Sequence, residues 1–163
     1  MDDENDDSLN LTRPPTDEDL ANLCAKLNQL GAQYIVVGGL AIIAAGYTRA
    51  TMDIDLLVDV SPENDAQVRE ALESLPEKAI LEVGPGEIAN YVVVRVCDEF
   101  TVDLMAKACG MTYDEAKEMI VCRDHLGVRI LLRRAAKWDN HNQKLKKRWC
   151  NSGCLRQATK KPN

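Results

Sequence analysis

The feature that most constrains the fold is a glycine pair, Gly38-Gly39, followed after thirteen residues by two aspartates, Asp53 and Asp55. The glycines end an apolar run, 34–37, that is typical of a buried strand, and they allow the backbone to turn tightly into a helix. The aspartates open a second apolar run, 53–60. Because alternate residues of a strand point to the same face, the two carboxylates are expected side by side.

Two carboxylates this close repel each other, and one would take up a proton unless a cation lies between them. Mg²⁺ is a natural occupant because it prefers oxygen ligands. A third acid, Asp103, lies in the apolar run 100–105, where an unpaired charge is costly. A shared metal ion explains why an acid stands there. The other interpretation places Asp103 at a solvent-facing sheet edge, as we expect for Asp98 and Glu99.

The segments Val37-Gly38-Gly39 and Asp53-Ile54-Asp55-Leu56 resemble the signature of the DNA polymerase β-type nucleotidyltransferase superfamily. That signature is an apolar residue, Gly-Gly or Gly-Ser, a spacer, and then Asp-apolar-Asp-apolar. Arg49-Ala50-Thr51, just ahead of the acids, is similar to small bacterial nucleotidyltransferases of the AbiEii-like toxin type. The resemblance runs roughly from Leu20 to Ile130. A lone Asp-x-Asp is weak evidence, but the glycines, the spacing and the apolar flanks together are specific.

The resemblance implies a metal-dependent nucleotidyltransferase. A hydroxyl of an RNA (tRNA) or protein acceptor would attack the α-phosphate of a nucleoside triphosphate such as ATP, and pyrophosphate would leave. Two Mg²⁺ ions, about 3.5–4 Å apart, would stabilise the attacking and leaving oxygens. Asp53, Asp55 and Asp103 would be the catalytic and metal-binding residues, and Asp103 would help to deprotonate the hydroxyl. The toxin-type resemblance adds an antitoxin as a partner.

Five residues are candidates for nucleotide binding. Gly38 and Gly39 would let the triphosphate approach backbone N–H groups at a helix N-terminus, and the alternative, a plain strand-to-helix turn, is compatible with that role. Arg49 would clamp a phosphate, or be a solvated loop cation. Thr51 would contact the nucleotide, or bond to the loop backbone. Lys107 would bind a phosphate, or be solvated at a strand end.

The order of elements predicts an α+β fold, a mixed β-sheet with helices packed on one face, as in the polymerase β palm. We expect an acidic, disordered N-terminus (1–15), a nucleotidyltransferase domain (16–132) and a basic C-terminal tail (133–163). The expected helices are 20–30 after a capping box at Thr16, one beginning at Ser61-Pro62, and one running from a capping box at Thr112 to Ile120. Further expected elements are a buried helix at 40–45, strands at 79–83 and 128–132, and a hairpin of 91–97 with 100–105 joined by a tight Asp98-Glu99 turn. His125 is expected in a polar turn.

Charge is distributed unevenly along the chain. The net charge of −6 and the aromatic content of 4% argue against a chain that binds nucleic acid over its whole surface or by base stacking. From Leu131 to Asn163, however, ten Lys and Arg residues face a single Asp, a net charge of +9 that leaves −15 for the remainder. This tail is interpreted as a divergent end, a frame-altered end or an RNA-contacting arm.

No run of about 20 apolar residues predicts a membrane span. The chain opens with acidic residues rather than a signal peptide, and its six cysteines show no disulfide framework, so the cytoplasm is the expected location. Two rival functions remain. One is a catalytically silent relative that binds a partner. The other is a glycosyltransferase, whose Asp-x-Asp also holds a metal ion, although that class needs a longer chain and Gly-Gly so close upstream does not suit it.

Overall fold

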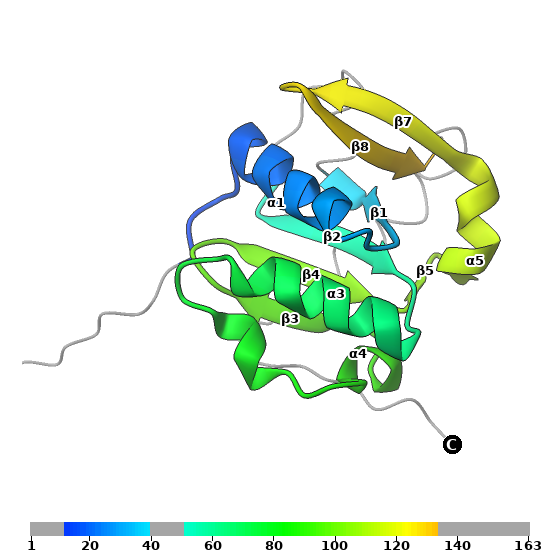
Figure 1. Cartoon of the computed structure of the whole chain (residues 1–163), viewed down its shortest axis with the longest axis horizontal. Coiled ribbons are helices and arrows are strands. Elements are labelled where there is room, and N and C mark those ends of the chain that lie inside the picture. The colour runs from blue at the N-terminus through cyan, green and yellow to red at the C-terminus, as the bar shows by residue number, and fades with distance from the viewer. Residues whose placement is uncertain (1–11, 40–50, 134–163) are drawn as a thin grey trace, which may run out of the picture.

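The computed structural model describes residues 12–39 and 51–133 of the chain (Figure 1). Six strands form one sheet, in the order β3-β4-β2-β1-β8-β7, and β5 and β6 form a small second sheet. The helices are α1 (Asp17–Gln29), α3 (Pro62–Glu73), α4 (Glu87–Asn90) and α5 (Tyr113–Ala116), with 3₁₀ turns η1 (Ala79–Glu82) and η2 (Lys117–Met119). The strands are β1 (Tyr34–Val37), β2 (Asp53–Val58), β3 (Val94–Cys97), β4 (Thr101–Met105), β5 (Lys107–Ala108), β6 (Met111–Thr112), β7 (Ile120–His125) and β8 (Val128–Arg133).

The main sheet is mixed, which confirms the predicted α+β class. β2 runs parallel to β4 and antiparallel to β1, and β1 runs parallel to β8. The hairpins β3–β4 and β7–β8 close the two ends of the sheet with antiparallel pairs. The parallel pair β2–β4 is the one that matters for the site, because it places equivalent positions of two central strands side by side.

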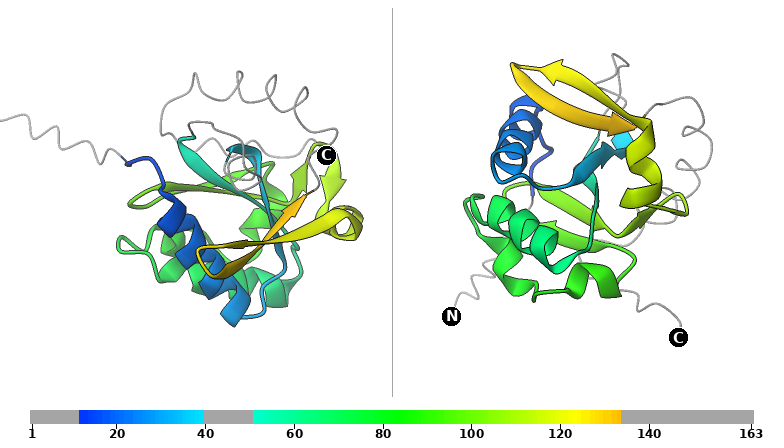
Figure 2. Two further views of the ribbon diagram at one scale, coloured as in Figure 1. Left: turned by 90° about the horizontal axis from the view of Figure 1, so that it is seen from above. Right: turned by 45° about the vertical axis from the view of Figure 1, so that its right-hand side comes forward.

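The two long helices, α1 and α3, pack side by side over one face of the sheet (Figures 1 and 2). Each begins as the sequence predicts, α1 at the Thr16 capping box and α3 at Ser61 with Pro62 in the first turn. Between helices and sheet lies an aliphatic core. On β2 it includes Ile54 and Leu56, which are fully buried. Burying one such side chain stabilises the fold by about 1.5–3 kcal/mol, so this face accounts for much of the stability.

Fewer of the described residues pack against the opposite face of the sheet. A smaller apolar cluster forms there between Ile35, Val37 and Leu57 of the sheet and Ala108, Tyr113 and Ala116 beyond β4. Strand residues therefore alternate between the two faces, as the period of two requires. The same face also carries three aspartates, Asp53, Asp55 and Asp103, which form the candidate site.

Several sequence predictions are wrong. The strand predicted at 79–83 is wrong, since Ala79–Glu82 form the 3₁₀ turn η1 after Lys78, whose positive φ of 49° turns the chain. The helix predicted from Thr112 to Ile120 is shorter: α5 and η2 end at Met119, and residues 120–125 form the strand β7. His125 is the last residue of that strand rather than part of a turn, and its side chain is 20% exposed. The hairpin between β3 and β4 has three loop residues, 98–100, rather than two.

Asp98, predicted to face solvent, is buried at 5% exposure. Its carboxylate accepts hydrogen bonds from the backbone N–H groups of Glu77, Ala79 and Glu99. A buried acid is tolerated when its oxygens are satisfied in this way. Asp98 thereby fixes the loop that sets the register of β3 against β4.

The predicted helix at 40–45, Arg49 and the tail beyond Arg133 lie outside the described residues. Within the described ranges, no helix has the length and apolar character needed to cross a membrane.

Candidate active site

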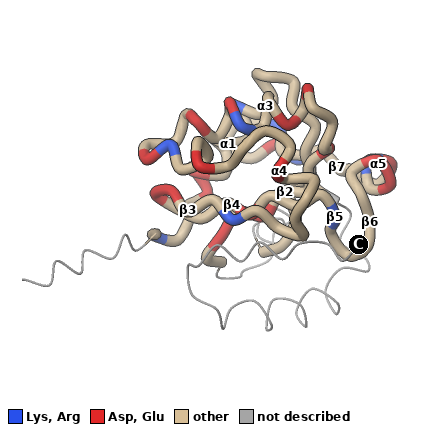
Figure 3. Tube along the Cα trace, turned by 90° about the horizontal axis from the view of Figure 1, so that it is seen from below, with Lys and Arg blue, Asp and Glu red and all other residues tan. Residues whose placement is uncertain are grey.

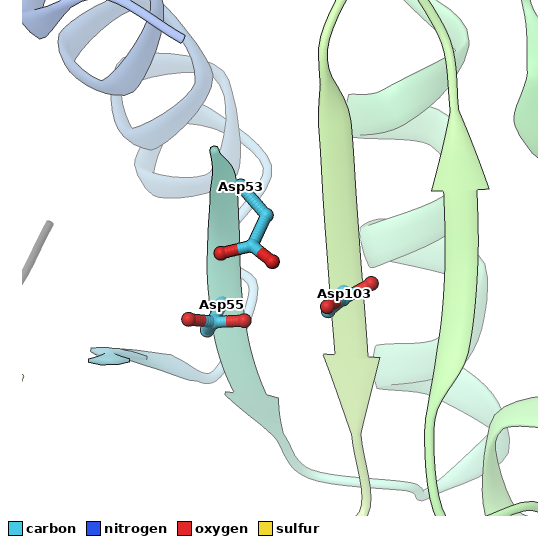
Figure 4. A group of neighbouring side chains, drawn as sticks. All are labelled: Asp53, Asp55 and Asp103. Atoms are coloured by element: carbon cyan, nitrogen blue, oxygen red, sulfur yellow. The ribbon is translucent and has the colours of Figure 1, made fainter. Parts of the chain in front are cut away.

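Three carboxylates meet on the sheet face opposite α1 and α3. Asp53 and Asp55 project from the same side of β2, and Asp103 projects from the neighbouring strand β4 (Figure 4). The parallel register places Asp55 directly beside Asp103. One carboxylate oxygen of each residue lies within 4.8 Å of the others. The expected convergence of the three acids is confirmed, and their role as ligands stays a prediction.

These acids are not ordinary surface charges. Asp55 and Asp103 are only 6% and 5% exposed, and Asp53 is half-buried. The strand period explains their position, because Ile54 and Leu56 must enter the helix-covered core and so turn the acids to the other face. Burial of like charges at this separation is unfavourable unless positive charge compensates them.

Gly38 makes room for one of these carboxylates. It has a φ of +73°, and a Cβ built on it would lie 2.0 Å from Oδ2 of Asp55. Val37, just before it, is the register partner of Asp55. Gly38 and Gly39 are helical at the end of β1. The glycine is therefore required by the position of Asp55 as well as by the turn, a reason that the sequence pattern alone did not reveal.

Arg95 completes the group. It lies opposite Asp103 in the β3–β4 register. Its Nε donates to Oδ1 of Asp103 at 2.8 Å, and its Nη2 donates to Oδ2 of the same carboxylate at 2.8 Å. Nη2 also reaches Oδ2 of Asp53 at 3.4 Å. The hydrogen bonds to Asp103 raise the pKa of the Arg95 guanidinium, so this side chain remains a cation.

Sequence reasoning missed Arg95, and the reason is the loop length. A two-residue turn at Asp98-Glu99 would pair Arg95 with Val102, on the core side of β4. The three-residue loop shifts the register by one position and pairs Arg95 with Asp103. Such a shift exchanges the faces on which side chains meet. A hairpin prediction that considered both loop lengths would have brought Arg95 to the acids.

The charges of this group favour a bound cation. Two unit charges 4 Å apart interact by about 4 kcal/mol at an effective dielectric constant of 20. Three carboxylates within 4.8 Å therefore make three such repulsions, and in the described part of the chain Arg95 adds a positive charge that partly offsets them. Carboxylate oxygens are the donors that Mg²⁺ takes in proteins. The donor set and its spacing thus fit a hard divalent cation held by Asp53, Asp55 and Asp103.

Of the other candidate residues, the structure describes Thr51 and Lys107. The Thr51 hydroxyl donates to the backbone carbonyl of Asp53 at 3.1 Å, the loop-backbone contact that was the alternative to nucleotide binding. Lys107 is exposed in β5, beyond the end of β4, and pairs across the small sheet with Thr112. Arg49 lies outside the described residues. Their roles in nucleotide binding stay predictions.

A family model described as a nucleotidyltransferase of unknown function (DUF6036) matches residues 16–114. The chain belongs to this family. The match includes all three carboxylates, Arg95 and both glycines. It places this DUF6036 nucleotidyltransferase in the superfamily that the Gly-Gly and Asp-x-Asp pattern indicated.

The fold of the DUF6036 chain also matches a solved structure. The structure is that of a protein from Thermotoga maritima (TM1012), described as a "putative nucleotidyltransferase". The two share 14% sequence identity with a TM-score of 0.54, over 81% of this chain and 90% of that one. At this identity the likeness shows the fold alone. No curated protein matches the DUF6036 chain in sequence.

Proposed function

We propose that the chain is a Mg²⁺-dependent enzyme that transfers a nucleoside monophosphate from a nucleoside triphosphate to a hydroxyl of RNA. The observation that carries the proposal is the meeting of Asp53, Asp55 and Asp103 within 4.8 Å on two parallel strands. Membership of a nucleotidyltransferase family supports the reaction class.

In this reaction the acceptor oxygen forms a bond to the α-phosphorus, and the bond from that phosphorus to the bridging oxygen breaks. Pyrophosphate leaves with the electron pair. Mg²⁺, of which two ions are expected, would supply positive charge for the phosphate oxygens when bound. Asp53 and Asp55 would hold it together with Asp103, which also takes part in removing the hydroxyl proton. Gly38 and Gly39 leave the backbone open to the triphosphate at the end of β1.

The proposal names RNA as acceptor because of the tail. In the described residues, twenty Asp and Glu residues stand against ten Lys and Arg, and acidic positions recur on α3 and α5 (Figure 3). Such a body repels a polyanion. The basic tail follows β8, whose last residues run parallel to β1 at the level of Val36 and Leu132, next to the end that leads to Gly38. β8 therefore finishes at the same end of the sheet as Val37, the register partner of Asp55.

The direct experiment is incubation with each labelled nucleoside triphosphate, Mg²⁺ and total RNA, with a chelator as control. We expect label to enter RNA only when Mg²⁺ is present. Label in protein instead of RNA would change the acceptor. Absence of label with all four nucleotides would overturn the proposal and favour the catalytically silent binding protein.

A deletion tests the RNA acceptor separately. Removing residues 134–163 should weaken RNA binding and flatten its salt dependence, because each phosphate contact that is lost removes the release of a counterion. Divalent metal binding by the three acids should not change. Equal RNA binding by the two chains across a salt series would exclude the tail as the RNA-binding element.

We also propose that the chain is a toxin of a toxin–antitoxin system, and this part of the proposal rests only on the resemblance of Arg49-Ala50-Thr51 to the toxin-type enzymes. It predicts that expression of the chain arrests growth, that Asp55→Asn relieves the arrest, and that an antitoxin partner does the same. Normal growth on expression of the active chain would remove the toxin from the proposal and leave the transferase reaction intact.

A further inference from the structure

Arg95 connects β3 to the carboxylate group. Its guanidinium makes a two-pronged hydrogen bond to Asp103, at 2.8 Å for both contacts, and a longer one of 3.4 Å to Asp53. The Arg95 side chain is 26% exposed and that of Asp103 only 7%. A bidentate pair with one partner this buried has a fixed geometry, unlike an ion pair between two solvated side chains.

The arrangement leaves Asp103 able to bind a metal ion. A carboxylate has about four lone-pair positions on its two oxygens. The fork of Arg95 takes one position on each oxygen, so Arg95 alone does not fill the carboxylate. The guanidinium and a cation can therefore contact Asp103 at the same time. Arg95 would then fix the plane of the carboxylate that the cation meets.

The same guanidinium also places positive charge among the acids before any metal binds. Asp53, Asp55 and Asp103 carry three formal negative charges, and Arg95 places one positive charge beside them. A positive charge fixed next to the ligands attracts the carboxylates and repels an incoming cation. Its effect on metal affinity is therefore opposite to that of a residue that merely holds the fold together.

We propose that Arg95 is a positioning residue that orients Asp103 for the metal and weakens metal binding by its charge, so that the chain folds without metal and releases it readily. This inference rests on the proposed function, since it requires that the three acids bind a divalent cation. The planar fork of Arg95 orients the Asp103 carboxylate, and the positive charge of Arg95 limits the affinity for the metal ion.

Two substitutions distinguish the fork from the charge. Arg95→Met removes both, and Arg95→Lys keeps the charge but loses the planar fork. Arg69→Met is the matched control. Arg69 is a half-buried arginine of α3 on the helix-covered side, and it donates to the carbonyl of Val83 at 3.2 Å.

The measurement is calorimetric titration of the metal-free full chain with Mn²⁺, together with thermal unfolding with and without Mn²⁺. Arg95→Met should bind Mn²⁺ about tenfold more tightly than wild type, because a repelling charge has gone. Without metal, Arg95→Met should unfold at a lower temperature than wild type, and added Mn²⁺ should restore its unfolding temperature. A variant that is unfolded without metal and folds when Mn²⁺ is added would support the inference equally.

Arg95→Lys should bind Mn²⁺ within about threefold of wild type but transfer nucleotide at least about tenfold more slowly, because its ammonium cannot orient Asp103. Arg69→Met should change neither the Mn²⁺ affinity nor the rate of nucleotide transfer.

Equal or weaker Mn²⁺ binding by Arg95→Met, beside a wild type that binds normally, would overturn the inference and leave the proposed function intact. Wild-type turnover by Arg95→Lys would overturn the orienting role. A wild-type chain that binds no Mn²⁺ would overturn the proposed function and this inference together.

Discussion

The two faces of the six-stranded sheet carry different kinds of side chain, although β2, β3 and β4 contribute to both. Towards α1 and α3, these strands present Ile54, Leu56 and Val102, all fully buried in one aliphatic core. Towards the other side, the alternate residues include Asp55 and Asp103. The apolar residues on one face of a strand can therefore stabilise it, while the alternate residues on the other face carry charges that do not contribute to stability.

The largest expected effect belongs to the acid face. Asp53→Asn or Asp55→Asn should reduce nucleotide transfer at least about a hundredfold, because loss of metal charge removes several kcal/mol from the transition state and each 1.36 kcal/mol is a factor of ten. Asparagine has nearly the same shape, and the repulsion among the acids falls, so thermal stability should hold or rise. The labelled-nucleotide assay and thermal unfolding measure the two effects.

Asp114→Asn is the control for these variants, because Asp114 is an exposed acid of α5 that accepts a hydrogen bond from Lys117 in η2. It should keep full activity. Turnover near wild type in either Asp53→Asn or Asp55→Asn would show that the assignment of the acids is wrong.

On the helix-covered face the effect should be on stability. Leu56 is fully buried, so Leu56→Ala should lower the free energy of unfolding by about 2–5 kcal/mol through lost contacts and a cavity. Val60→Ala, at a position 38% exposed just after β2, should change it by less than about 0.5 kcal/mol. Denaturant unfolding gives both values. If Leu56→Ala remained folded but lost its Mn²⁺ affinity, the two faces would not be independent.

Gly38→Ala should lower both the stability and the Mn²⁺ affinity, because Gly38 lies directly against the Asp55 carboxylate. The positive φ alone costs about 1–3 kcal/mol for a residue other than glycine. The added Cβ would also displace the Asp55 carboxylate, so Mn²⁺ affinity should fall. Gly127→Ala is the matched control, since Gly127 has a φ of +77° but no atom within 4 Å of the added Cβ. Should both variants retain Mn²⁺ affinity, the contact between Gly38 and Asp55 would have no role in the site.

The smallest change concerns two thiols. Cys24 lies fully buried in the helix-side core, and burial raises its pKa to about 12. Cys97 is exposed on β3, on the same side as Arg95. At pH 8 an alkylating reagent should modify Cys97 and spare Cys24 until the chain unfolds, as mass spectrometry of the fragments would reveal. Because the folded pKa of Cys24 is raised, its contribution to stability is complete below about pH 9 and declines as pH rises towards 12. Modification of Cys24 in the folded chain would contradict the closed core.

Much of the fold followed from the sequence where a local signal was strong. Tyr34–Val37 is a strand as predicted, and the Thr16 capping box begins α1. The acids of β2 were placed correctly because two residues of a strand separated by one share a face regardless of its neighbours. Their meeting with Asp103 needed a long-range contact with a later strand, which the family resemblance implied, and the structure provides it as a parallel pair.

The misses have physical causes that local patterns do not contain. The position of Arg95 depends on one loop residue, and that loop is held by backbone N–H groups donating to Asp98. Two of these N–H groups belong to Glu77 and Ala79, so the sequence around Arg95 does not reveal the length of the loop. β7 has a largely exposed, charged sequence, Ile120–His125, and it is a strand because it pairs along its length with β8. Tertiary pairing there overrides a weak local preference.

The central claim is that Asp53, Asp55 and Asp103 hold a divalent metal ion for nucleotidyl transfer. The most direct test is anomalous scattering from Mn²⁺ in crystals grown with a nonhydrolysable nucleoside triphosphate. We expect a peak about 2.0–2.6 Å from an oxygen of each of the three acids, with the triphosphate on the same side of the sheet. A nucleotide bound elsewhere, or crystals with no Mn²⁺ peak between these carboxylates, would contradict it.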